Sequence, residues 1–521
     1  MKGQWVAPLS ECGIGAALQQ LKANGLAEAP MLQTLNADVM RRRATGFPAD
    51  RRALLVEVLN DQTGPDATEV QHALLRRLAQ PDSVTVVAGH QLVTGLGPLY
   101  VHAKVAETVA LAAYWTEKGV PTVPVFWMAS EDHDADEIRR IFWRGKVQGS
   151  WAAPAAPLRS GAMPAQPVAD AISLWMKSES LPEPVRWAAE RSEDAYRTSA
   201  NLADATRKLM GLWHPEVLVL DASDVRLKAA AAELWDDEIR NQTLYSTRGE
   251  ASRPWGDQTP PVPFRPSALF ALDSEGARLR LDRSEDGQWQ RADGCSMGGD
   301  RDVAEWAAAH PERVSPNALL RPIYQEHILP NAAYTGGAGE LAYAYQLVPY
   351  WAQTGRDHGV WRLRHSGTWI PPRAKKGREL IGAARLRGPW DPDLVRREVL
   401  ANAGAPDARE RPVTDHIARL VAQHYTQPGL ERSAAAWVQR IAAEEARMVE
   451  RVRREFAHRE AVALRRIQDV ADALMPAGIL QERIWTHFDL VEHAGPDAVR
   501  AYLDAYSQQA VWDESAWWEF T

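Results

Sequence analysis

The fold is decided by the sequences VTVVAGHQLVTGLGPLYVHAK at residues 84–104 and VPVFWMASEDHDADE at residues 123–137. Each opens with a short apolar run rich in valine, which is typical of a strand buried on both faces. Residues 101–116 place apolar side chains at helical spacing, and Gly119 is suited to end that helix. Strand, glycine-containing loop, helix and strand form a βαβ unit, which predicts parallel strands joined by a right-handed crossover.

Polar residues follow each of these two strands. Gly89, His90 and Gln91 follow the first strand, and a polar run that contains His133 follows the second. Ligands of open α/β sheets bind beyond the carboxyl ends of the strands, so we expect a functional site here. Helix capping would explain one or two of the carboxylates, but it explains less well the whole acidic set: Glu131, Asp132, Asp134, Asp136 and Glu137.

Length and composition exclude several classes of protein. A chain of 521 residues predicts two or three domains, and 45% hydrophobic with 25% charged residues is typical of a soluble globular protein. A net charge of -8 disfavours a general nucleic-acid binder. The sequence shows no signal peptide and no bilayer-spanning stretch, and Cys12 and Cys295 are too few for a disulfide framework, so we expect a cytoplasmic protein.

Later segments predict further strands of an α/β core. Residues 217–221, VLVLD, form an apolar run that ends in an acid, and residues 332–335 form another. Gly336 to Gly339 follow the second run, and Glu340 then opens a helix, an arrangement whose backbone N–H groups could hold an anion across a cleft from Gly89. Strands are also predicted at 141–147 and 360–370, and residues 260–299 predict a small antiparallel insertion.

The remaining segments predict helices. Residues up to about 80 show amphipathic patterns at 16–21, 51–59 and 69–78, and Arg41 to Arg43 are interpreted as a solvated face, with anion contact as the alternative. Residues 428–474 repeat apolar side chains at intervals of three, four or seven, which predicts one coiled-coil helix on the order of 65 Å long. Its antiparallel partner would come from near 394–400 or 413–423.

We therefore predict an α/β fold, with a Rossmann-like parallel-sheet core, connecting insertions and an α-helical coiled-coil domain. The predicted parts are N-terminal helices and the first part of the core at 1–150, its second part with the small β segment at 151–310, its last part at 311–385, the helical arm at 386–475 and a helical tail docked on the body at 476–521.

Several of these segments together resemble the BshC family, the cysteine-adding enzymes of bacillithiol biosynthesis. The resemblance rests on GHQ at 89–91 with GPLY at 97–100 and Lys104, on PVFWMASEDHDADE at 124–137, on LRP at 320–322 with LP at 329–330 and GGAGELAY at 336–343, and on LMPAG at 474–478 with LQER at 480–483. They occur in the family's order. His90 stands where the family usually has a glutamine, and Ala338 where it usually has a proline.

The resemblance implies a ligase that joins the carboxyl group of cysteine to the amine of glucosaminyl malate, and a homodimer formed through the coiled coil. A carboxylate must first be activated, most simply as an acyl-adenylate, so we expect ATP or another nucleotide; the metal requirement stays open. We assign Gly89, His90, Gln91 and Gly97 to the cofactor, Lys104, His133 and Asp132 to catalysis, and the substrates to Glu131, Asp134, Tyr100, Gly336, Gly337 and Glu340.

Two other functions remain open from the residues alone. The acidic run at 131–137 would also suit a metal- or acid-dependent hydrolase of amino-sugar conjugates. The third hypothesis is a non-catalytic scaffold that acts through its coiled coil. Neither alternative calls for nucleic acid or membrane partners.

Overall fold

The computed structural model describes residues 3–8, 35–65, 67–256, 259–381, 391–507 and 516–520. The chain divides into two compact units, Met1–Thr368 with Gln481–Thr521, and Trp369–Leu480. Each unit is described by itself. The finer domain boundaries expected from the sequence stay predictions.

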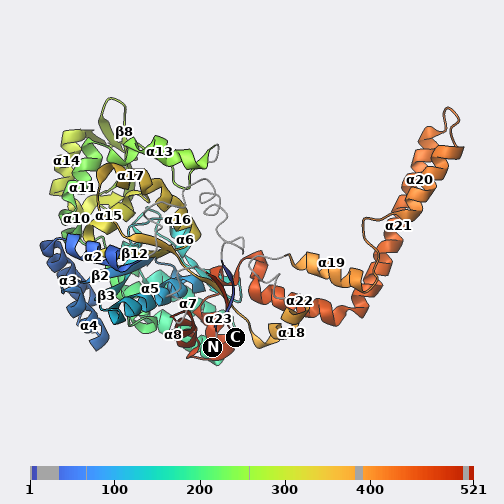
Figure 1. Ribbon diagram of the computed structural model, residues 1–521, viewed down its shortest axis with the longest axis horizontal. Coiled ribbons are helices and arrows are strands. Elements are labelled where there is room, and N and C mark those ends of the chain that lie inside the picture. Colours follow the sequence, from blue (N-terminus) through green and yellow to red (C-terminus); the bar gives the residue numbers. More distant parts are fainter. Residues whose placement is uncertain are drawn as a thin grey trace. The chain divides into compact units, whose positions relative to one another are not determined.

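A five-stranded parallel sheet forms the centre of the first unit (Figure 1). When the strands are numbered in chain order, their order across the sheet is 3-2-1-4-5. This is the order of a Rossmann-like fold, so the predicted Rossmann-like core is confirmed. The order reverses between the first and fourth strands, and ligands of such sheets bind at that reversal. The strands are β2 (Val84–His90), β3 (Thr122–Met128), β6 (Leu218–Asp221), β12 (Asn331–Gly336) and β13 (Val360–Leu363).

The predicted βαβ unit consists of β2, α5 (Leu99–Glu117) and β3. The two strands pair in parallel from Val84 opposite Thr122 to His90 opposite Met128. Their carboxyl ends are therefore level, and the polar residues that follow them leave the same edge of the sheet. All of β3 is buried, which explains why its sequence lacks the alternation of a half-exposed strand.

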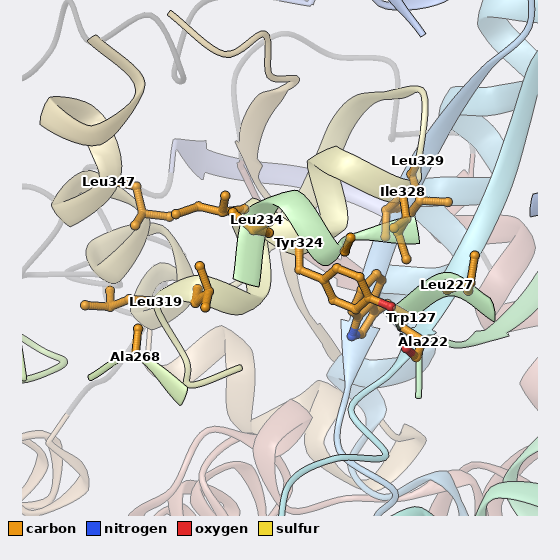
Figure 2. Close-up of a cluster of buried hydrophobic side chains, with 14 of the residues drawn as sticks. Trp127, Ala222, Leu227, Leu234, Ala268, Leu319, Tyr324, Ile328, Leu329 and Leu347 are labelled. Carbon is orange, nitrogen blue, oxygen red and sulfur yellow. Dashed lines mark hydrogen bonds between the residues drawn. The ribbon is translucent and has the colours of Figure 1, made fainter. Parts of the chain in front are cut away.

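The core beside β3 is built around aromatic rings (Figure 2). Trp127 lies edge-on to Tyr324 with ring centroids 5.9 Å apart, and Trp235 lies 5.0 Å from the same tyrosine. The Tyr324 hydroxyl donates a 2.8 Å hydrogen bond to the carbonyl of Ala222, just beyond β6. Tyr324 is fully buried, so this bond satisfies a polar group that would otherwise cost free energy in the interior.

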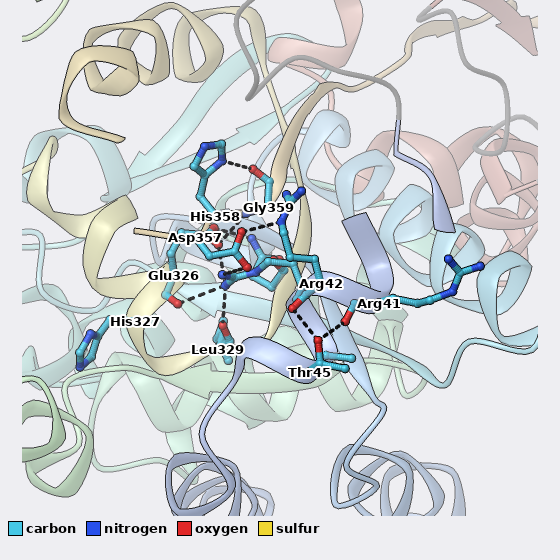
Figure 3. Close-up of polar contacts among 12 residues, drawn as sticks. Arg41, Arg42, Thr45, Glu326, His327, Leu329, Asp357, His358 and Gly359 are labelled. Atoms are coloured by element: carbon cyan, nitrogen blue, oxygen red, sulfur yellow. Dashed lines mark hydrogen bonds and ion pairs between the residues drawn. The ribbon is translucent and has the colours of Figure 1, made fainter. Parts of the chain in front are cut away.

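The basic cluster at residues 41–43 divides between surface and interior (Figure 3). Arg41 is solvated, whereas Arg43 is 5% exposed, pairs with Glu326 at 3.0 Å and donates to the carbonyl of Asn331 at 2.7 Å. Glu326 in turn accepts a 2.9 Å bond from the amide of Gly359, which precedes β13. Arg43 thus fastens α2 (Ala37–Gly46) to Glu326 of α15 (Leu320–Ile328) and to the first residue of β12, a role that the default interpretation of a solvated face missed.

The predicted antiparallel insertion forms a second five-stranded sheet, in the order β10-β9-β8-β7-β11. Its strands are β7 (Leu269–Leu272), β8 (Arg278–Arg283), β9 (Gln288–Arg291), β10 (Ser296–Gly299) and β11 (Val314–Pro316). The strand predicted at 141–147 is instead a hairpin of β4 (Arg140–Trp143) and β5 (Lys146–Ser150), because Arg144 and Gly145 adopt positive φ and turn the chain.

Helices supply most of the remaining first unit. Beside those already named, they are α3 (Ala49–Thr63), α4 (Glu69–Leu78), α6 (Ala135–Ile138), α7 (Gln166–Ser178), α8 (Glu183–Arg197), α9 (Leu202–Trp213), α10 (Val225–Ala230), α11 (Ala232–Arg240), α12 (Thr243–Ser246), α13 (Arg248–Ser252), α14 (Asp300–Ala309), α16 (Ala338–Ala344), α17 (Val348–Thr354), α23 (His487–Ala494) and α24 (Ala498–Ser507).

The chain ends differ from the expectation of helix. β1 (Gly3–Pro8) pairs antiparallel with β15 (Ala516–Phe520), so the helical tail is wrong for its last residues. The AWWEF sequence of β15 is rich in aromatic residues, which favour strands once a partner is present. The helix expected at 16–21 lies outside the described residues. The alternating segment at 360–370 is two strands, β13 and β14 (Ser366–Trp369), rather than one.

The second unit is helical, with α18 (Pro372–Ile381), α19 (Pro392–Asn402), α20 (Pro412–His424), α21 (Glu431–Arg459) and α22 (Ala461–Leu474). The single long helix is therefore wrong, since a break at Glu460 separates α21 from α22. Along α21 no residue is buried, whereas α22 buries an apolar face against α18 and α19, and the break lies at this change. Glu445 of α21 accepts 2.8 Å bonds from the amides of Val413 and Thr414, which sets α20 beside it.

No helix in the described part of the chain is long and apolar enough to cross a membrane.

Candidate active site

Two adjoining cavities open at the carboxyl ends of the parallel strands. The first, here called the switch cavity, has a volume of about 400 Å³ and lies where the strand order reverses between β2 and β12. The second, here called the arginine cavity, has a volume of about 310 Å³ and lies between the end of β3 and the antiparallel sheet. Both volumes are in the range of small-molecule sites. The cavities share four lining residues: Trp127, Ala129, Asp132 and Arg321.

The β2 exit gives the switch cavity a neutral imidazole. His90 places Nδ1 3.0 Å from the carbonyl of Gln91, so this nitrogen carries the proton, and Nε2 lies 2.8 Å from the Tyr100 hydroxyl, from which it accepts. Burial, with the nearby charge of Lys104, lowers the pKa of His90 to about 4. His90 therefore positions Tyr100 and stays uncharged at neutral pH.

An ion pair bridges the two sides of the strand reversal. Lys104 of α5 is 2% exposed, pairs with Glu340 of α16 and donates to the carbonyl of Gly89 at 3.2 Å. Burial lowers the pKa of Lys104, and Glu340 opposes that shift. Burial alone would raise the pKa of Glu340, but Lys104 and the bonds from the Tyr334 hydroxyl, at 2.6 Å, and the Gly337 amide, at 2.7 Å, lower it to about 2. The Lys104 ammonium thus has Glu340 as its counter-ion and links α5 to α16.

A second buried pair closes the switch cavity beyond β13. Arg364 and Glu482 are 5% and 1% exposed at their side chains and lie 2.6 Å apart, and the Arg364 guanidinium lies 5.2 Å from the centre of the Tyr100 ring. Glu482 also accepts from the amide of Gly367. Because this pair anchors residues 481–483, it brings the exposed Arg483 to the cavity wall.

Asp132 is the carboxylate that both cavities share. Its Oδ2 accepts a 2.6 Å bond from the side-chain amide of Gln91, and its Oδ1 accepts a 2.8 Å bond from the backbone amide of His133. The side chain remains 36% exposed, so it is accessible from the cavities. Gln91 therefore couples the exits of β2 and β3 and aims a carboxylate at their junction.

His133 lies beside the arginine cavity, although it lines neither cavity. Its Nδ1 lies 2.9 Å from the guanidinium of Arg278, which can only donate, so Nδ1 accepts and the proton is on Nε2. Burial, and then the charge of Arg278, lower the pKa of His133. A neutral imidazole held in this way has no basic nitrogen left for a substrate while the contact persists.

The other acids beyond β3 have separate partners. Glu131 pairs with Lys228 at 2.6 Å, and this lysine is 1% exposed with its ammonium 4.8 Å from the centre of the Tyr324 ring. Burial lowers the pKa of Lys228, and Glu131 opposes the shift. Asp134 accepts from the amide of Asp136 and caps α6, as the capping interpretation allows. Glu131 and Asp132 line the arginine cavity, and Asp134 lines neither.

The predicted glycines shape the walls in different ways. Gly97 has φ +65°, and a Cβ there would lie 2.4 Å from Val93, so a side chain would break the turn into α5. A Cβ at Gly89 would lie 3.1 Å from the Tyr334 hydroxyl, which shows how closely β2 approaches β12. Gly89 and Gly337 line the switch cavity, whereas Gly97 and Gly336 do not.

The structure thus brings most of the predicted site residues to one place, and their roles stay predictions. The sequence did not indicate a site role for the arginines. Arg321 and Arg483 lay within quoted segments without a role, and Arg278 alternates with leucines, a pattern that ordinarily indicates an exposed face. The residues at the switch cavity are Gly89, His90, Gln91, Tyr100, Lys104, Asp132, Gly337 and Glu340 from the predicted set, with Arg321, Arg364 and Arg483 added.

Within the described residues, no group of three or more His, Cys, Asp or Glu side chains could hold a metal ion. The switch cavity could hold a nucleotide, since it lies at the strand reversal and its wall includes glycines and Arg483, which has no ion pair among the described residues.

Comparison with known families identifies both parts of the chain. Residues 30–365, more than half of the chain, match the family model described as the bacillithiol biosynthesis BshC N-terminal Rossmann-like domain. Residues 417–510 match the BshC C-terminal coiled-coil domain.

Curated relatives share the same name, "Putative cysteine ligase BshC". The protein of Flavobacterium johnsoniae is 28% identical over 379 residues, which are 72% of this chain and 70% of the relative. That of Cytophaga hutchinsonii is 33% identical over 57% of this chain and 55% of its own length. That of Solibacter usitatus is 28% identical over 91% of each.

Proposed function

The chain belongs to the BshC family of bacillithiol biosynthesis, and from this premise we propose that it is a ligase that joins the carboxyl group of cysteine to the amine of glucosaminyl malate. The observation that carries the proposal is the junction of two cavities at Asp132 and Arg321. Amide formation needs an acyl donor and an amine to meet at one point, and adjoining cavities with a shared wall provide such a point.

The donor side is the switch cavity. A carboxylate is a poor electrophile, so ATP or another nucleotide supplies the activation when it is bound. Of this chain's residues, Gln91, Tyr100 and Arg483 would hold the donor, and the paired charges of Lys104–Glu340 and Arg364–Glu482 keep the walls in place. Those pairs are fixed before substrate binds, so no reorganisation is needed when charge develops at the acyl oxygen.

The amine side is the junction. An amine reaches the site as an ammonium, and Asp132 can bind it there as an accessible carboxylate held by Gln91. The ammonium must lose a proton before its nitrogen attacks the acyl carbon, and Asp132 accepts that proton directly or through water. The new C–N bond forms as the bond from the acyl carbon to the activating group breaks.

We propose in addition that the second unit joins two copies of the chain. Apolar side chains remain exposed along α20 and α21, including Val413 at 56%, Trp437 at 40% and Met448 at 57%. A helix pair that leaves such residues in water is stabilised when a second copy covers them. The family match to a coiled-coil domain supports this assignment.

The test is incubation of the purified chain with cysteine, glucosaminyl malate and ATP, with the thiol product followed by mass spectrometry. We expect product that depends on all three components. Asp132→Asn should lower kcat, whereas Asp134→Asn, a matched control in the same acidic run, should keep it within about twofold because Asp134 lines neither cavity. Absence of product with any nucleotide or thioester donor, or release of amine from a sugar conjugate without nucleotide, would contradict the ligase assignment.

A further inference from the structure

The arginine cavity carries more positive charge than its own acids neutralise. Four arginines line it together with Glu131 and Asp132. Arg280 is already held by Asp282 in a two-bonded pair, at 2.7 and 2.8 Å, and Glu131 is held by Lys228. Three guanidinium groups then face one shared carboxylate, Asp132. The three are Arg265, Arg278 and Arg321.

Arg278 is buried in this wall and is held there by hydrogen bonds. It is 8% exposed, and all of its hydrogen bonds go to neutral groups: the Ser315 hydroxyl at 2.9 Å, the Pro316 carbonyl at 2.8 Å and Nδ1 of His133 at 2.9 Å. In the described part of the chain, no carboxylate forms an ion pair with it. A buried charge without a counter-ion is costly, and such groups are ordinarily paired or bind a ligand.

Arg321 stands where the two cavities meet. Its guanidinium lies 5.6 Å from the centre of the Trp127 ring and 5.5 Å from that of Tyr334, and Nη1 donates to Gln325 at 3.0 Å. Nη2 is buried and has no hydrogen-bond partner in the described structure. Arg265 also lines the cavity; it is exposed and has no ion pair among the described residues. Two arginines held by hydrogen bonds and one exposed arginine thus line the same cavity.

We propose that the arginine cavity binds a small dicarboxylate group, with Arg278 and Arg321 as the fixed anchors and Arg265 closing over it. The planar guanidinium donors match carboxylate oxygens two at a time. The lining also has an apolar part formed by Val262, Pro263 and Phe270, beside the neutral polar Ser130, Ser267 and Asn317. None of its described residues is a glycine, whereas the glycine loops that suit phosphate line the switch cavity. Two carboxylates leave the three guanidinium groups and Asp132 balanced in charge.

The proposal rests on the proposed function for its placing of the substrates. A ligand with two carboxylates at one end and an ammonium at the other would put the former in the arginine cavity and the latter at Asp132. In the ligase, this ligand is the acceptor, whose malyl end enters the arginine cavity while the activated cysteine occupies the switch cavity. Arg278 has a further consequence, because its bond to His133 links occupancy of the cavity to the position of the imidazole.

The binding test uses L-malate with the full-length chain, measured by isothermal titration calorimetry. We expect saturable binding of L-malate that acetate and inorganic phosphate do not match. Arg321→Met and Arg265→Gln should each weaken it about tenfold or more. Arg280→Gln is the matched control, since this arginine lines the same cavity but is neutralised by Asp282, and it should change the affinity less than twofold. Circular dichroism confirms that each variant is folded, and Arg265 is exposed, so its substitution leaves the core intact.

The outcomes separate this inference from the ligase function. If L-malate binds through Arg321 and Arg265 while no amide product forms, the dicarboxylate site stands and the ligase function fails. If product forms and Arg265→Gln leaves the KM for glucosaminyl malate unchanged, the site is wrong and the ligase function stands. Phosphate binding that equals or exceeds malate binding and needs Arg321 would overturn the dicarboxylate assignment, as would equal losses in the Arg280 control.

Discussion

Replacing Lys104 by methionine is expected to destabilise the strand reversal strongly and in a pH-dependent way. The substitution keeps the length of the side chain and removes the ammonium that pairs with Glu340 and donates to Gly89. Loss of one partner of a buried pair costs about 3–5 kcal/mol. Because Glu340 is 23% exposed and keeps its bonds from Tyr334 and Gly337, we expect a cost of about 3 kcal/mol, at the lower end of that range.

The pH dependence follows from the carboxylate that is left behind. In the intact chain the pKa of Glu340 is about 2, so its contribution to stability is present above the ordinary carboxyl pKa and is lost as the pH falls through that lower value. Without Lys104, burial dominates and the pKa of Glu340 rises. The defect should therefore be largest at neutral pH and should shrink as the pH falls and Glu340 takes up a proton.

Hydrogen exchange by mass spectrometry of the peptides that cover residues 84–104 and 331–344 measures this locally. A cost of about 3 kcal/mol corresponds to a roughly 100-fold increase in the opening equilibrium. Lys104→Met combined with Glu340→Gln should recover much of the protection, because neither charge is then left unpaired. The reasoning is refuted if the single variant exchanges within about twofold of the wild type, or if the double variant is no better protected than Lys104→Met.

Three further outcomes follow from other parts of the chain. Burial lowers the pKa of His102 to about 4 and lowers the pKa values of His214 and His487 well below the usual value. The free energy of unfolding that is present above about pH 6.5 should therefore fall as acid is added, by up to about 1.4 kcal/mol per pH unit for each histidine. His487→Leu should make this pH dependence less steep, as measured by urea unfolding. Glu445→Ala should speed hydrogen exchange of the backbone amides at the start of α20, because its carboxylate caps that helix. Met448→Lys should shift a dimer toward monomer in light scattering, and a wild type that is already monomeric would exclude the proposed pairing.

The core of the fold was predictable because its signals are local. The apolar runs at 84–88 and 123–128 and the helix between them need only periodicity and the handedness of a crossover. The break at Glu460 and the strand β15 were not predictable in this way. Both depend on what lies beside the segment: an apolar face that becomes buried along α22, and a strand from the other end of the chain.

The clustering of most of the predicted site residues was predictable, whereas the partner of each residue was not. Glu131, Asp132 and Asp134 are near neighbours in sequence and look equivalent there. The structure gives them different roles, because Glu131 meets a lysine of α10, Asp132 meets the amide of Gln91, and Asp134 caps its own helix. The chemical role of a carboxylate depends on its counter-ion and its exposure, and both are set by distant segments.

The environments of the cations also depend on distant segments. An arginine in an alternating strand is ordinarily exposed, so the sequence around Arg278 indicates no site. Two observations from the structure point to a role for Arg278. Three neutral acceptors hold its guanidinium in place, and it has no ion-pair partner in the described chain. Since burial of an unpaired guanidinium lowers stability, the fold carries a cost there that an anionic ligand would offset. The unpaired arginines, more than the acids beyond β3, therefore indicate the charge of the substrate that this junction is built to receive.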